Sequence, residues 1–160
     1  MRKKLLTLII ALLLSLPAVC FAGVTPTITS DDRSFNPLTG IYELTGNVFV
    51  QFPIKGTDIT IVADYAKVQM YQLEVHGNGG IKLNFGDIGF TCDNVDVYGS
   101  ERTAYMSGSS DFNADGVHIT SDNSSYCWKT KLASFSGNVV VNGEPKSGDV
   151  YYNIRNRSFE

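Results

Sequence analysis

The sequence predicts an all-β protein, one elongated body of stacked, bent antiparallel strands. Three observations point to this fold. Apolar and polar residues alternate with a period of two through most of the chain, as they do in half-buried strands. A pattern centred on a glycine and an aspartate recurs about four times, at intervals of about 30 residues. Charged residues make up only 18% of the chain, against about 25% in an average soluble domain.

The first 22 residues have the layout of a secretory signal peptide. Three basic residues at 2–4 precede an almost unbroken apolar run at 5–16, and small residues at Cys20 and Ala22 suit a cleavage site. The run is short of the ~20 residues that span a bilayer. We therefore predict a signal peptide at 1–22 and a single domain at 23–160, exported to the periplasm, with an uncleaved membrane anchor as the alternative.

The predicted mature domain is acidic. Removal of residues 1–22 takes three basic residues from the total of 13 and leaves 10, against 16 acidic residues, a net charge of −6. A nucleic-acid-binding protein would show a basic excess or stripe. The sequence therefore argues against nucleic acid as a partner.

A repeated glycine marks one position of each unit. The segment 28–50 aligns without a gap on 119–141, and two weaker copies lie between them. The glycine follows alternating apolar residues in all four copies, at Gly46, Gly77, Gly108 and Gly137. A glycine on the apolar face of a strand indicates a bend, a bulge or a close backbone approach.

A repeated aspartate marks a second position. It follows an apolar-x-small triplet at Asp31, Asp64, Asp93, Asp122 and, less clearly, Asp149. The apolar positions change parity across each aspartate, so the strand must turn or gain a residue there. We predict a structural role for the aspartate as a cap of that bend.

Each unit therefore reads as two bent strands, and we expect a dozen or more strands in the whole stack. Polar turn sequences at 78–80, 115–116 and 142–143 favour hairpins over solenoid coils. A stack of this kind leaves unpaired edges, here near Ile28 and within 150–159, and such edges can accept a strand from a partner or from a second copy.

Two linked motifs carry a family resemblance. Residues 44–50 read apolar-x-Gly-Asn-Val-x-Val, residues 61–66 read Ile-x-Ala-Asp-x-Ala, and weaker copies continue to Val150. In this pattern the chain resembles the OstA-like, or LptA-type, periplasmic lipopolysaccharide-transport proteins. The resemblance covers nearly all of the predicted mature domain. It implies an OstA-like β-jellyroll of V-shaped antiparallel strands around an apolar groove.

The resemblance also implies a function and partners. The protein would bind lipopolysaccharide through its lipid A acyl chains and carry it passively from the inner-membrane transporter to the outer-membrane assembly complex. Its partners would be LptC-type and LptD-type jellyrolls, and its copies would assemble head to tail. The repeated apolar face supplies the predicted lining of the groove: Leu44, Val48, Val50, Ile59, Ile61, Leu83, Phe85, Phe90, Ile119 and Val139. These side chains could equally pack against one another as a dry core.

Two rival functions fit the same sequence. One is a membrane-anchored LptC-type partner in the same machinery. The other is a structural or adhesive β-solenoid that polymerises without carrying lipid. Catalysis has no support, because the paired carboxylates and the nucleophile motifs that enzymes use are missing from the sequence. The sequence indicates no cofactor.

Hypotheses of a specific calcium, zinc or aromatic site have little support in the sequence. Segment 111–122 nearly matches an EF-hand calcium loop, but its Asp115-Gly116 reads first as a hairpin turn. The two histidines, His76 and His118, are predicted on exposed strand faces and have no zinc-site spacing. Tyr126 and Trp128 are expected to pack in the core or at its rim.

Cysteine chemistry is limited to two residues in the predicted mature domain. Cys92 is predicted to face the interior and Cys127 to face outward. Export would permit a disulfide, but opposite faces make a bridge between the two difficult. The sequence leaves the pairing open.

Overall fold

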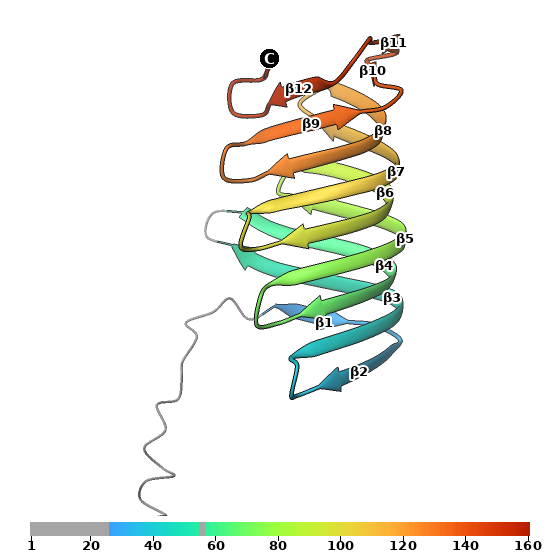
Figure 1. The fold of residues 1–160 in the computed structure, drawn as a ribbon, viewed down its shortest axis with the longest axis vertical. Coiled ribbons are helices and arrows are strands. Elements are labelled where there is room, and N and C mark those ends of the chain that lie inside the picture. The colour runs from blue at the N-terminus through green and yellow to red at the C-terminus, as the bar shows by residue number, and fades with distance from the viewer. Residues whose placement is uncertain (1–25, 55–56) are drawn as a thin grey trace, which may run out of the picture.

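The computed structural model describes residues 26–54 and 57–160, and the predicted signal peptide lies outside them. The described residues form 13 β-strands in one open antiparallel sheet (Figure 1). The strands are β1 (Thr27–Thr29), β2 (Asp32–Asn36), β3 (Ile41–Ile54), β4 (Thr57–Gln69), β5 (Glu74–Phe85), β6 (Ile88–Tyr98), β7 (Thr103–Ala114), β8 (Val117–Cys127), β9 (Leu132–Ser136), β10 (Val140–Val141), β11 (Glu144–Pro145), β12 (Val150–Asn153) and β13 (Ser158–Phe159).

The six long strands β3–β8 each run through two layers. In layer A, the part of β3 at 41–45 pairs with β2, whereas in layer B the part at 49–51 pairs with β1. At the other end of the stack, β9, β12 and β13 continue layer A and β10 and β11 continue layer B. The sheet is therefore folded along a line across its strands, and each long strand is V-shaped (Figure 1).

The fold line is a row of β-bulges. On β3 the register jumps from Thr45 to Val48, so that Gly46 and Asn47 stand opposite a single residue, Asp64. Equivalent pairs follow on the next odd-numbered strands and in the link after β9, all with φ between +45° and +78°: Gly46–Asn47, Gly79–Gly80, Gly108–Ser109 and Gly137–Asn138. Two left-handed residues in succession redirect the strand, at the level where the apolar positions of the neighbouring strand change parity across its aspartate.

The repeated aspartate holds each bulge from the neighbouring strand. A Cβ built on Gly46 would lie 2.6 Å from Asp31 Oδ2, and one built on Gly79 would lie 2.5 Å from Asp64 Oδ2. At the first and last bulges of the row, Asn47 Nδ2 donates to Asp31 Oδ2 at 2.7 Å and Asn138 Nδ2 donates to Asp122 Oδ2 at 2.9 Å. The predicted structural role of the aspartate is confirmed, although it braces the next strand rather than a turn in its own.

Two details of the sequence pattern are wrong. The bulge glycine of the second unit is Gly79, not Gly77, which lies buried in regular strand with Val95 and Ile81 around it. Residues 78–80 therefore form the bulge within β5 and not a hairpin turn. The alternation of apolar and polar residues could not distinguish the two glycines, because positions 77 and 79 have the same parity.

Other features of the predicted fold are confirmed. Residues 115–116 join β7 to β8, and residues 142–143 join β10 to β11. The free edges lie at β1 and β2 at one end and at β11 and β13 at the other. Those at β1 and β13 lie where they were predicted, near Ile28 and within 150–159, whereas the edge at β11 was not predicted. Among the described residues there is no helix long and apolar enough to cross a membrane.

Candidate functional site: an apolar interior and its mouth

The ten predicted lining residues all lie between the two layers. Each is at most 2% exposed, and all belong to one buried apolar cluster that runs from the first unit to the last. Their inward orientation is as predicted. In this structure, however, they contact one another in a filled core. Their role as a lipid-binding lining therefore stays a prediction.

The interior changes character along the stack. Its first half is aliphatic, with residues such as Leu44, Val50 and Ile61. Its second half is aromatic: ring centroids lie 4.9 Å apart for Phe90 and Phe112 and 5.2 Å apart for Phe112 and Phe135. Tilted aromatic pairs at these distances contribute beyond their buried area. Aromatic pair interactions are therefore concentrated in the second half of the core.

The two layers are continuous at the fold line but separate at the opposite side, the mouth, where the hairpin turns of both layers face each other. A single ion pair among the described residues crosses the mouth. It joins Arg157 Nε, in the β12–β13 turn of layer A, to Asp115 Oδ2, in the β7–β8 turn of layer B, at 3.1 Å. The Arg157 side chain is 68% exposed, so this pair adds little to stability. Apolar contacts between the layers, such as that of Phe85 with Trp128, also join the two sides of the mouth.

A pocket of about 360 Å³ opens at this mouth. Layer B contributes the β5–β6 turn, with Phe85, Gly86, Asp87 and Ile88, and layer A contributes Lys131, Ile154 and Arg155. The backbone N–H of Ile154 donates to the carbonyl of Lys131 at 2.9 Å, which holds the two layer A turns side by side. We call this the mouth pocket.

Two aromatic side chains stand behind the wall of the mouth pocket. The Phe85 ring packs edge-on against Tyr126, with centroids 4.7 Å apart, and it also packs against the half-buried Trp128 at 5.7 Å. The Tyr126 hydroxyl is the one buried side-chain polar atom in the described part of the chain without a hydrogen-bond partner. Burial raises the pKa of Tyr126 to about 12, with smaller contributions from Cys127 and from the Asp87 carboxylate on the pocket rim.

Neither the mouth pocket nor this hydroxyl emerged from the sequence. Tyr126 and Trp128 were expected as core and rim residues, and they are, but period-two alternation says nothing of which turns face each other across the mouth. The clustering of basic residues at 129, 131, 155 and 157 was the available signal. Its meaning depends on the β8–β9 and β12–β13 turns being neighbours in layer A.

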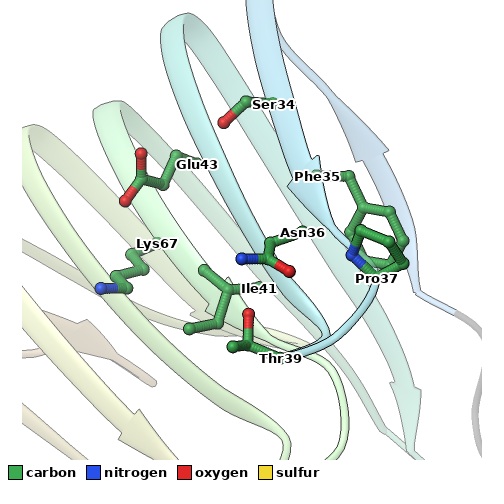
Figure 2. A pocket seen from close by; sticks show the side chains of 8 residues that line it. All are labelled: Ser34, Phe35, Asn36, Pro37, Thr39, Ile41, Glu43 and Lys67. Carbon is green, nitrogen blue, oxygen red and sulfur yellow. The ribbon is translucent and has the colours of Figure 1, made fainter.

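The first end of the stack exposes two edge strands and several apolar side chains. Every residue of β2 is exposed, and Leu38, in the turn after it, is 91% exposed. A groove of about 510 Å³ lies here, and Figure 2 shows the side chains that line it, from β2, the following turn, β3 and β4. Glu43 and Lys67 extend into it from adjacent strands. This groove lies on the outer, polar face of layer A and is separate from the interior.

The second end of the stack exposes a groove of about 450 Å³. It lies between the last strands of the two layers and has Val141, Val150 and Phe159 on its apolar part and Lys146, Asp149 and Glu160 on its polar part. Phe159 is 49% exposed and packs against the buried Tyr152, with centroids 5.0 Å apart. The apolar interior therefore reaches the surface at this end.

The other candidate residues have local partners. Asp111 accepts from Asn113 and contacts His118 Nε2 at 2.9 Å, while Asp122 belongs to the bulge row, so the two ends of the calcium-like segment face different neighbours. His76 is paired with Asp96 at 2.6 Å on the outer face of layer A. In the described ranges, no group of three potential metal ligands comes together.

The two cysteines face opposite sides, as predicted, and both are free thiols. Burial raises the pKa of Cys92 to about 12. At Cys127 burial also acts to raise the pKa, but hydrogen bonds from Thr130, Lys129 and Thr103 outweigh it and lower the pKa to about 7.

Comparison with known proteins supports the fold. No protein-family model and no curated protein matches the chain. Among solved structures, the fold matches LptH from Pseudomonas aeruginosa, described as the LptA homologous periplasmic component of the conserved lipopolysaccharide transport device. The TM-score is 0.56 at 10% sequence identity, and the match covers 74% of this chain and 81% of that chain. The resemblance to LptA-type proteins is thus confirmed at the level of fold: the chain is an LptA-type β-jellyroll.

Proposed function

We propose that this protein is a periplasmic lipopolysaccharide-binding bridge, which passively carries lipopolysaccharide from the inner-membrane transporter to the outer-membrane assembly complex. The observation that carries the proposal is the apolar interior, one buried cluster that runs through all units of an LptA-type jellyroll. Likeness to a periplasmic transport component supports the same conclusion. The interior is the part of the molecule suited to acyl chains.

The energetics of acyl-chain transfer are favourable. Each CH₂ group moved from water into an apolar interior contributes about 0.8 kcal/mol, so roughly ten of them contribute about 8 kcal/mol. The acyl chain must displace side chains that now contact one another. Across the mouth, the described residues oppose that displacement with one exposed ion pair and apolar packing. The mouth is therefore the side at which the layers separate most easily.

The ends of the stack fit the partners of such a bridge. Unpaired strands at both ends can extend the sheet by strand addition, and the interior reaches the surface at the β11 and β13 end. We propose that LptC-type and LptD-type jellyrolls, and further copies of this chain, add at these edges. Sedimentation velocity across a range of concentrations tests self-assembly, since head-to-tail growth gives a series of species that lengthens with concentration.

Photocrosslinking tests lipid binding without burying a charge. The photoreactive analogue benzoylphenylalanine is placed at Phe90, which is 1% exposed between the layers, and in a control at Tyr105, which is 43% exposed on the outer face. Light should link lipopolysaccharide to position 90 and not to position 105. Equal labelling at both positions, or none at either, contradicts the proposal.

A structural role without lipid is the second candidate, and the filled core favours it. The ten lining side chains leave no open channel between them in this structure. A polymerising structural protein would assemble end to end and give no adduct at position 90. The LptC-type alternative is tested by sequencing the N-terminus of the protein isolated from cells, since a chain that starts at Gly23 has lost the segment an anchor needs.

A further inference from the structure

The mouth pocket combines an apolar wall with two cationic side chains. Phe85, Ile88 and Ile154 supply the apolar surface, and Lys131 and Arg155 stand at the rim. Neither cation takes part in an ion pair with any residue the structure describes. Asp87 is the one carboxylate on the rim. The formal charge of the rim is therefore +1, on a predicted mature chain of net charge −6.

The backbone keeps the two turns that carry the cations side by side before any ligand binds. Lys131 and Arg155 belong to different turns, which the Ile154 to Lys131 hydrogen bond keeps together. Two cations on turns that are already held together need less backbone ordering to bind one anion than two cations on independent loops do. Both also provide N–H donors for charge-assisted hydrogen bonds to anionic oxygens.

A polar group without a partner lies just behind the apolar wall. Tyr126 is fully buried, its ring contacts Phe85, and its hydroxyl has no hydrogen-bond partner. Leaving a buried hydroxyl unpaired is costly, and phenylalanine would fill the same space without that cost. An unpartnered hydroxyl beside a cation-rimmed pocket points to a polar ligand that reaches this part of the interior.

We propose that the mouth pocket is the headgroup site for an anionic amphiphile. Lys131 and Arg155 bind its phosphate or carboxylate oxygens at the rim, and its alkyl chain passes Phe85 into the interior, where the Tyr126 hydroxyl meets the polar atoms nearest the chain. This inference rests on the proposed function, because it assigns an orientation to a lipid whose chains occupy the interior. It adds that the headgroup charge is recognised, and by which residues.

The single tryptophan of the chain reports on the site. Trp128 contacts Phe85 at the pocket wall, so its fluorescence should change when an amphiphile displaces that ring. We would titrate the purified protein with dodecyl phosphate, and with dodecyl maltoside as a neutral amphiphile of equal chain length. We expect a saturable change with both, and affinity at least about tenfold higher for the phosphate.

Variants assign the effect to the named residues. Lys131→Gln and Arg155→Gln should each weaken dodecyl phosphate binding about tenfold and leave dodecyl maltoside binding unchanged. Lys129→Gln is the matched control, since it removes a cation from the same turn but not from the pocket, and it should bind as the wild type does. Asp87→Asn should strengthen phosphate binding, because it removes the one negative charge of the rim.

The outcomes separate this inference from the proposed function. If both amphiphiles bind equally, or the two cation variants bind as the wild type does, the headgroup site is refuted and the lipid-binding interior stands. If inorganic phosphate alone saturates the site with the affinity of dodecyl phosphate, the pocket is a free-anion site and the inference is wrong. If neither amphiphile binds and position 90 gives no lipopolysaccharide adduct, both proposals fail.

Discussion

Replacing Gly79 by alanine tests the device that bends every strand. Gly79 has φ +78°, and an added Cβ would lie 2.5 Å from Asp64 Oδ2 and 2.8 Å from Asp64 Cβ. A left-handed conformation costs an alanine about 1–2 kcal/mol. The overlap reaches the Asp64 Cβ and cannot be relieved by rotating the carboxylate alone, which adds about 1–2 kcal/mol. We expect Gly79→Ala to lower the free energy of unfolding by about 2–4 kcal/mol.

Gly77→Ala is the matched control, two residues away in the same strand. Gly77 is not in the left-handed region, and its added Cβ would lie 3.1 Å from Val95 Cγ1 and 3.3 Å from Ile81 Cδ1. Both contacts are with side-chain ends that can move by a few tenths of an ångström. Replacing a strand glycine also reduces the conformational entropy of the unfolded chain, which favours the folded state by roughly 0.5–1 kcal/mol. We expect the unfolding free energy to stay within about 1 kcal/mol of the wild type.

Urea unfolding, followed by circular dichroism and Trp128 fluorescence, gives the unfolding free energies. The double variant Asp64→Ala with Gly79→Ala removes the overlap with the carboxylate but keeps the approach to the Cβ of residue 64 and the left-handed strain, so it should be less destabilised than the sum of its single changes. If Gly77→Ala is destabilised as much as Gly79→Ala, the bulge row is not what fixes the bend, and the reasoning fails.

Three further outcomes follow from the core and the thiols. Phe112→Ala removes the centre of the aromatic half and should cost about 3–5 kcal/mol in urea unfolding; a loss under about 1 kcal/mol would mean that this half repacks freely. Tyr126→Phe removes an unpaired buried hydroxyl and should raise the unfolding free energy by about 1 kcal/mol, which a hidden hydrogen bond would reverse. Iodoacetamide should alkylate native Cys127 at a rate that rises with pH around a midpoint near 7, because its pKa is about 7 and the thiolate is the reactive form. Cys92, buried with a pKa of about 12, should react only after unfolding, as mass spectrometry would show.

The sequence predicted most of the fold because the fold repeats. Alternation specified which residues face inward, and all ten lining positions are buried. The parity change at Asp64 and its equivalents predicted the bend, since a side-chain period of two leaves no other way to keep the apolar residues on one face. The error at Gly77 has the same origin. Alternation cannot distinguish two glycines of equal parity, and only the aspartate across the strand pair selects Gly79.

The mouth pocket could not be predicted in this way. Its residues come from three turns, and turns carry no periodicity. Lys131 and Arg155 are 24 residues apart in the sequence and become neighbours because β9 pairs with β12. Asp87 and Ile88 then face them from layer B, which depends on how the two layers close. The sequence therefore predicts features that depend on one strand and its neighbours. It does not predict features that depend on how one layer packs on the other.

The bulge row also explains why the interior is continuous. Each long strand bends at the same level, because an aspartate on one strand always braces a glycine on the next, from Asp31 with Gly46 to Asp122 with Gly137. A bend displaced by two residues in one unit would place polar residues between the layers and divide the interior. Only the first and last bulges add an aspartate–asparagine hydrogen bond, because only these two have asparagine after the glycine. The terminal units thus keep the bend level up to the open edges, as a second jellyroll would need in order to continue the same interior.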